Sequence, residues 1–224
     1  MPRPRLHATA ADRQRAYRIR KRNARVEAEA LRNSSDEWFT PADVVELARQ
    51  VLGGIDLDPA SCVFAQRTVQ AVRWFSKAAD GLSQPWRGRV FLNPPYSHPL
   101  VARFTGKLVD EFSAGHVTAA ITVVNNATDA EWFQRLLAHF PACFTRGRIR
   151  FYRVDRKPIS PRLGQVFFYL GGDVAGFEHV FGAVGIVKLA PSIRLLAAEE
   201  LGARGGATGP KLARAIAELE ADRD

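Results

Sequence analysis

The residues best suited to chemistry follow the apolar run 90–92 and are Asn93, Pro94, Pro95 and Tyr96. Two consecutive prolines stiffen the turn and lack backbone N–H groups, so the carbonyl of Pro94 is expected to stay outside the hydrogen bonding of the sheet. The side-chain oxygen of Asn93 and this carbonyl form a pair of acceptors that suits an NH2 group on a planar ring. Because an amide is not a base, we expect the pair to promote attack by that amine through preorganised electrostatics.

Tyr96 places an aromatic ring beside these acceptors. We expect the ring to stack on a base turned out of a nucleic-acid helix, a contact that contributes about 1–3 kcal/mol. The alternative is a purely structural Asn-Pro-Pro turn after a strand. The tetrapeptide alone does not separate the two, so the elements around it and its companion residues have to decide.

The first half of the chain alternates apolar strands with amphipathic helices. Strands are expected over 55–58, 70–76, 88–93 and 116–124, with a helix over 99–115 between the last two. A strand, a crossover helix and a further strand indicate a parallel sheet with helices on its faces. The predicted fold class is therefore α/β.

Two further regions complete this prediction. Thr40 is expected to cap a helix that has Pro41 at its first position and runs to the glycines at 53 and 54. In the second half, a helix is expected over 129–140, followed by strands that include antiparallel ones, over 147–154, 164–171 and 183–189. The result is a mostly parallel twisted sheet with helices on both faces and antiparallel strands near the C-terminal end.

Polar residues stand where two of the predicted parallel strands end. Asp58 ends the strand that contains Ile55 and Leu57, and Asn93 ends the strand over 88–93. In an open α/β sheet, ligands collect in the crevice beyond the carboxyl ends of the strands. We therefore expect Asp58 and Asn93 to face one crevice.

Charge is distributed unevenly along the chain, whose formal net charge is +9. Residues 1–33 carry +7 of this charge, and the remaining residues carry only +2. The basic segment contains no Gly or Pro from 11 to 32 and predicts a helix without an apolar stripe. It is either a solvated, partly disordered arm or an arm that orders on DNA phosphates through Arg13, Arg15, Arg18, Arg20, Lys21 and Arg22.

Other sequence features limit the function classes. No apolar run is long enough to span a bilayer, and the charged N-terminus is unlike a secretory signal, which indicates a cytoplasmic protein; the resemblance described below implies that the cell is a bacterial host or a phage-infected cell. Cys62 and Cys143 form no CxxC pair, so we expect buried free thiols and no metal site. Three segments are expected: the basic arm 1–33, a catalytic domain 34–200, and a linker with a short helix over 201–224.

The ordered run DEWFTP, DLDPAS, DGL and VFLNPPYS resembles the phage-type DNA N-6-adenine methyltransferases, the phage Dam family, over about residues 36–170. This resemblance implies a Rossmann-like methyltransferase sandwich, S-adenosylmethionine as cofactor and DNA as partner. It also implies site-specific methyl transfer to a flipped adenine, with Asn93, Pro94, Pro95 and Tyr96 holding the base. Protection of phage or prophage DNA in restriction-modification is the purpose it implies.

The resemblance also implies a set of cofactor-binding residues. Trp38, Thr40 and Pro41 lie in the loop that contacts the methionine end of the cofactor, and Thr40 is a partner for its carboxylate. Asp58, with Pro59 and Ala60 after it, would face the α-amino group, and Asp80 would contact the adenine amine. The alternatives are purely structural roles: a helix cap for Thr40, a strand-end turn for Asp58 and a surface turn for Asp80.

The chain departs from the family pattern at two points. The Gly-x-Gly usual after the first strand is absent from 58–66, and no acid clearly ends the second strand, so the ribose contact stays unassigned. Arg146 and Arg148, on a predicted strand with alternating arginines, are further candidates for DNA contact. RNA-base or protein-glutamine methylation through the same motif, and a non-catalytic DNA-binding protein, remain the alternative functions.

Overall fold

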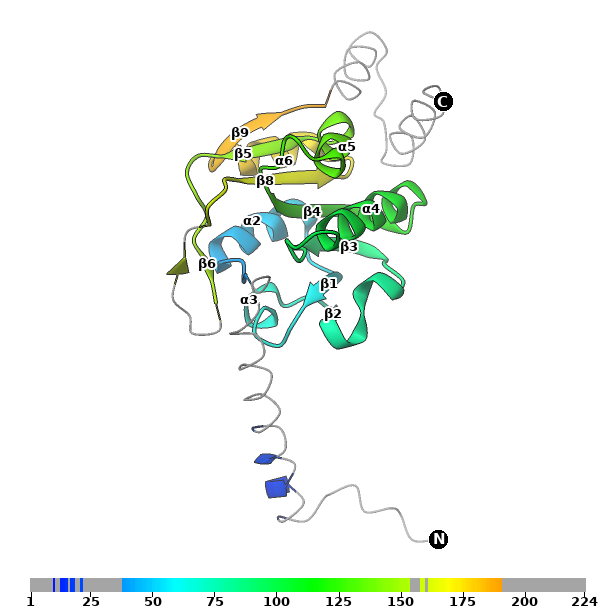
Figure 1. Cartoon of the computed structure of the whole chain (residues 1–224), viewed down its shortest axis with the longest axis vertical. Coiled ribbons are helices and arrows are strands. Elements are labelled where there is room, and N and C mark those ends of the chain that lie inside the picture. Colours follow the sequence, from blue (N-terminus) through cyan, green and yellow to red (C-terminus); the bar gives the residue numbers. More distant parts are fainter. Residues whose placement is uncertain are drawn as a thin grey trace.

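The computed structural model describes residues 10, 13–15, 17, 18, 21, 38–153, 158, 159 and 161–190. In this part of the chain a seven-stranded sheet has the order β2-β1-β3-β4-β8-β5-β9 (Figure 1). Strands β2, β1, β3 and β4 are parallel, β8 is antiparallel to both β4 and β5, and β9 is antiparallel to β5. The strands are β1 (Leu57–Ser61), β2 (Arg73–Ser76), β3 (Gly88–Leu92), β4 (Val117–Asn125), β5 (Ala142–Thr145), β8 (Gln165–Leu170) and β9 (Gly185–Lys188).

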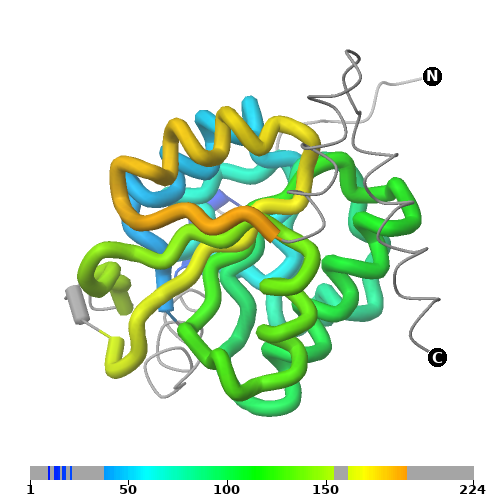
Figure 2. Tube along the Cα trace, turned by 90° about the horizontal axis from the view of Figure 1, so that it is seen from above, coloured from blue at the N-terminus to red at the C-terminus, as the bar shows by residue number. Residues whose placement is uncertain are grey.

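Helices cover both faces of this sheet, which confirms the predicted α/β class. Figure 2 shows α2 (Ala42–Leu52) and α6 (Val174–Phe181) together on one side, and α4 (Leu100–Ser113) and α5 (Glu131–His139) on the other. Each face has its own apolar cluster, so the sheet lies between two layers of core. The position of the sheet between helices explains why its central strands are apolar on both sides.

Strand β8 shows this two-sided burial directly. All six of its residues are buried. Val166, Phe168 and Leu170 pack in the cluster that contains α4 and α5, whereas Phe167 and Tyr169 pack in the cluster that contains α2 and α6. The alternation follows from the period of two in a strand.

Three expectations about local structure are wrong. Helix α2 begins at Ala42 with Pro41 at the N-cap position and no side-chain capping bond, so Thr40 is not its cap. The strand expected over 147–154 is reduced to β6 (Phe151–Tyr152): Gly147, at the start of the run, has a φ of 85°, and residues 148–150 are not in a strand. Strand β1 continues past Asp58 to Ser61.

The structure also contains elements that were not predicted, namely β5, α6 and the single helical turn α3 (Gln66–Val69). A two-stranded ribbon pairs β6 with β7 (Pro158–Ile159). Backbone bonds of 2.8 and 2.9 Å join Phe39 to Tyr152 of this ribbon. The segment 38–41 is therefore fixed to a second part of the chain far away in sequence.

The expected segment boundaries fall largely outside the described residues. This applies to the linker and helix over 201–224, to most of the basic arm, and to Arg20 and Arg22 within it. Of the arm, Arg13, Arg15 and Arg18 are described as helical and exposed. Both cysteines are buried free thiols, as expected.

The turn between β2 and β3 packs tightly against the end of β1. It consists of the 3-10 helices η1 (Lys77–Ala79) and η2 (Gly81–Ser83). A side chain at Gly81 would overlap the carbonyl oxygen of Pro59, so this position needs glycine. Below it, the buried indole of Trp86 donates from Nε1 to the carbonyl of Gly81 at 2.7 Å.

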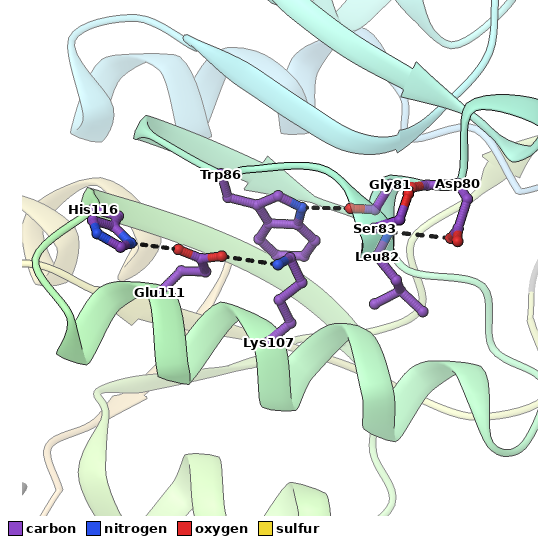
Figure 3. A network of polar contacts seen from close by, with 8 residues as sticks. All are labelled: Asp80, Gly81, Leu82, Ser83, Trp86, Lys107, Glu111 and His116. Atoms are coloured by element: carbon purple, nitrogen blue, oxygen red, sulfur yellow. Dashed lines mark hydrogen bonds and ion pairs between the residues drawn. The ribbon is translucent and has the colours of Figure 1, made fainter.

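Helix α4 supports the same turn from beneath (Figure 3). Nζ of Lys107 lies 5.5 Å from the Trp86 ring centroid and 2.8 Å from a carboxylate oxygen of Glu111. The other Glu111 oxygen lies 2.7 Å from Nδ1 of His116. The turn that carries Asp80 is thus held between β1 on one side and a buried indole on the other.

Replacing Gly81 by alanine should destabilise the protein by about 1–3 kcal/mol, because the added methyl group collides with backbone rather than with a movable side chain. The matched control is Gly106→Ala in α4, where an added Cβ meets nothing within 4 Å. There alanine should stabilise by about 0.5–1 kcal/mol through its higher helix propensity. Urea unfolding measures both changes, and equal midpoints for the two variants would contradict the close approach to Pro59.

Candidate active site

A cavity of about 230 Å³ lies at the carboxyl ends of the parallel strands β1 and β3. The expected crevice therefore exists, and it brings together residues from four separate segments of the chain. Of the residues singled out in the sequence, those that line it are Trp38, Thr40, Asp58, Pro59, Ala60, Asp80, Asn93 and Pro95. Pro94 and Tyr96 belong to the same turn but do not line the cavity, and Pro41 lines a neighbouring groove instead.

The amide of Asn93 is held from both ends. Its Nδ2 donates to the backbone carbonyl of Trp38 at 2.6 Å, and its Oδ1 accepts from the hydroxyl of Tyr96 at 2.8 Å. A carbonyl can only accept, so the NH2 end of Asn93 must face Trp38 and the oxygen must face Tyr96. The carboxamide oxygen has two lone pairs, so one acceptor site remains for a further donor.

Tyr96 has a role that the sequence did not indicate. Its hydroxyl lies 3.4 Å from the carbonyl of Val123 in β4 as well as bonding to Asn93. Burial raises the pKa of Tyr96 far above its ordinary value. The phenol therefore stays protonated and remains a donor that orients Asn93.

Asp58 is a buried carboxylate that lines the same cavity. Its Oδ2 accepts from Nε2 of Gln66 at 2.8 Å, and its Oδ1 accepts from the backbone N–H of Ala60 at 3.3 Å. Burial raises the pKa of Asp58 to about 6, although hydrogen bonds from Ser61, Ala60 and Gln66 act in the opposite direction. At pH 7 the group is mainly a buried anion, which would be stabilised by a cationic partner in the cavity.

The side chain of Gln66 makes three hydrogen bonds that fix the loop after β1, where the family's Gly-x-Gly is absent. Its Nε2 also donates to Oγ of Ser61 at 2.7 Å, and its Oε1 accepts from the N–H of Ala71 at 2.9 Å. Sequence reasoning missed this residue because its three partners meet only after α3 folds back on β1. The signal in the sequence that could have indicated this role is a glutamine five residues after the Asp-Pro-Ala-Ser strand end.

Thr40 carries a buried polar atom without an internal partner. The residue is 4% exposed, and its Oγ1 has no hydrogen-bond partner among the described residues. An unsatisfied buried hydroxyl costs about 1–3 kcal/mol. Since it lines the cavity, a ligand there can satisfy it.

Asp80 lies at the opposite wall and is exposed. Its φ of 47° places it in the left-handed region, and its Oδ1 accepts from the N–H of Leu82 at 3.3 Å. This geometry fits both a tight surface turn and a carboxylate presented to a ligand. The sequence missed several further lining residues, namely Ser76, Lys77, Leu100, Arg103 and Phe104.

The end of β2 carries no acid, as the sequence indicated. Ser76 ends this strand and Lys77 follows it, and both line the cavity. Among the described lining residues, the carboxylates are those of Asp58 and Asp80. Leu100, Arg103 and Phe104 share one face of α4 at helical spacing, which was the signal for their position.

The residues expected to contact DNA are only partly brought together. Arg146 is exposed just after β5. Arg148 is also exposed, but its Nη1 donates to the carbonyls of Pro161 and Arg162. The side chain therefore joins the segment after β5 to the segment before β8. The two arginines do not lie on a strand, which corrects the alternating pattern expected there.

Among the described residues, no group of three or more His, Cys, Asp or Glu side chains is placed to hold a metal ion. No helix in the same part of the chain is long and apolar enough to cross a membrane.

A comparison with protein-family models identifies the family of this chain. A model of the DNA N-6-adenine-methyltransferase (Dam) family matches residues 27–163, which is more than half of the chain. The search of curated proteins finds no match. The matched range includes the cavity loop, the buried Asp58, the turn at Asp80 and the Asn-Pro-Pro-Tyr turn. The chain belongs to the Dam family of DNA N-6-adenine methyltransferases and is a DNA adenine N6-methyltransferase.

Proposed function

We propose that Asn93 and the carbonyl of Pro94 hold the exocyclic amine of an adenine turned out of duplex DNA. The observation that carries this proposal is the fixed amide of Asn93, which lines the cavity with its oxygen oriented by Tyr96. A pair of acceptors draws the amine hydrogens into place and favours the nitrogen geometry that can attack. Proximity and alignment supply much of the remaining rate enhancement.

The family implies the use of S-adenosylmethionine, and the lining residues fit that cofactor. The buried carboxylate of Asp58 suits its α-amino group, and the unsatisfied hydroxyl of Thr40 suits its carboxylate. Trp38, Pro59 and Ala60 complete the walls at this end, and Asp80 is the acceptor proposed for the adenine amine. When bound, the cofactor supplies a methyl group activated by its sulfonium centre.

Some residues of this chain orient the amide of Asn93, and others bind the target base. Tyr96 fixes Asn93 through its hydroxyl, while its ring is proposed to stack on the target base. Pro95 contributes an apolar wall. Because Asn93 is not a base, the amine proton leaves to solvent or to a neighbouring group after transfer.

The family implies a DNA substrate. We propose the following residues as its contacts. Arg13, Arg15, Arg18 and Lys21 are exposed cations suited to phosphates of a duplex. Arg146 is a further candidate, and Arg20, Arg22 and Arg148 complete the set proposed from the sequence. Site-specific methylation of phage or prophage DNA inside a bacterial cell, as protection from restriction nucleases, is the purpose that fits this activity.

Replacing Asp58 by asparagine should separate stability from cofactor binding. The pKa of the carboxyl group is about 6 in the folded protein and 3.8 in the unfolded reference. The folded state therefore binds more protons between these values, and its stability falls as the pH rises through them. Between pH 4 and pH 7 the difference in unfolding free energy should shift by about 2.4 kcal/mol in favour of Asp58→Asn.

Urea unfolding at both pH values measures this shift, and calorimetry measures S-adenosylmethionine affinity, which should fall at least about tenfold at pH 7. Asp129→Asn, at an exposed position in the loop before α5, is the matched control. A variant that shows neither the pH-dependent gain nor the loss of affinity would refute the role of Asp58 as a buried anion facing the cofactor.

Replacing Asn93 by alanine should abolish methyl transfer to duplex DNA and leave S-adenosylmethionine binding within about threefold of the wild type, because the amide acts on the acceptor. Tyr96→Phe keeps the ring but removes the donor to Asn93, so its kcat should fall about tenfold with little change in DNA affinity. Single-turnover transfer and cofactor titration provide both readouts. Full activity of Asn93→Ala would rule out the proposed site.

A further inference from the structure

A second groove lies on the other side of the segment 38–41 from the cavity. It encloses about 310 Å³, and Phe39 and Thr40 line both spaces. Its other walls come from α3 with the turn before it and from the β6–β7 ribbon with the residue that follows β6. The lining residues that carry the argument are Phe39, Phe64, Arg67, Tyr152 and Arg153.

Two aromatic rings stack against each other in this groove. The rings of Phe39 and Phe64 are stacked, with centroids 6.3 Å apart and planes inclined by 20°. Both side chains are half-buried, and Tyr152 is 38% exposed at the same groove. With Tyr152, the half-buried rings give the groove an accessible aromatic lining, and a planar base can stack on such a lining.

The charge of the groove has a single sign. Arg67 and Arg153 line it, and no carboxylate is among its described lining residues. The guanidinium of Arg67 lies 4.8 Å from the Phe64 ring centroid, and that of Arg153 lies 5.8 Å from the Trp38 ring centroid. A cation beside an aromatic platform is the combination that binds a base and its phosphate together.

The groove is also next to the residue that contacts Asn93. The carbonyl of Trp38 accepts from Asn93, and the next residue is Phe39, one Cα step of about 3.8 Å away. Phe39 is fixed by its two backbone bonds to Tyr152. The groove therefore adjoins the segment that contacts Asn93, within reach of a nucleotide next to an adenine held there.

We propose that this groove binds a nucleotide that flanks the target adenine, with its base against the aromatic lining and its phosphate at Arg67. The proposal rests on the function proposed for Asn93, because the target adenine defines which nucleotide is the neighbour. It assigns to α3 and the loop 38–41 a substrate contact that is separate from cofactor binding. The contact holds the strand while the adenine is outside the stack.

The test compares variants of the full-length protein for binding to a labelled short duplex that the wild type methylates, in the presence of S-adenosylhomocysteine. Phe64→Leu keeps apolar bulk but removes the ring and should weaken binding about tenfold, whereas Phe64→Tyr should retain it. Arg67→Gln should reduce the slope of log affinity against log salt by about 0.9, the value of one phosphate contact. Arg87→Gln, at an exposed position before β3 and away from the carboxyl ends, should bind as the wild type does.

The outcomes separate this proposal from the one on which it rests. If the wild type methylates the duplex and Phe64→Leu and Arg67→Gln bind it normally, the groove proposal is wrong and the function of Asn93 stands. An equal loss of S-adenosylmethionine affinity in Phe64→Leu would overturn it as well, since the shared wall would then be the cause. A loss of affinity for single-stranded RNA alone would assign the groove to another ligand, and a wild type that neither binds nor methylates DNA would refute both proposals.

Discussion

The hydrogen bond from Asn93 to the carbonyl of Trp38 joins two parts of the chain that are 55 residues apart in sequence. It fixes which end of the amide faces the cavity loop, and Tyr96 then fixes the other end. The parallel pairing of β1 with β3 brings Asp58 to the same edge of the sheet. The amide and the loop are thus joined directly, and the buried carboxylate lines the same cavity.

This preorganisation has a cost that is visible in the fold. Asp58 is a buried anion whose pKa is raised to about 6, and the hydroxyl of Thr40 lacks an internal partner. Both features oppose folding, and they are the polar groups proposed to contact the zwitterionic end of the cofactor. Supporting interactions lie nearby, since Gln66 orients Asp58 and Trp86 holds the turn at Gly81 from below. Local destabilisation at the site is therefore offset by packing around it.

The central strands were predictable because their apolar runs are long and continuous. Helix α4 was predictable because its apolar residues recur at helical spacing. Strand β5 is only four residues long, and α6 includes Gly176, which weakens the helical pattern, so both were missed. The run 147–154 has alternating arginines, but Arg148 turns to the carbonyls of Pro161 and Arg162. At the site, the sequence predicted the residue types at the strand ends. It could not predict the Trp38 or Gln66 contacts, because these depend on how distant segments fold together.

The most direct test of the central claim is transfer of tritium from labelled S-adenosylmethionine to unmethylated duplex DNA, followed by nucleoside analysis. The account predicts label in N6-methyladenine, because Asn93 and Pro94 present acceptors to the exocyclic amine of a flipped adenine. Label in another base would mean that the site holds a different acceptor. No label in DNA, from a folded protein that binds the cofactor, would contradict the account.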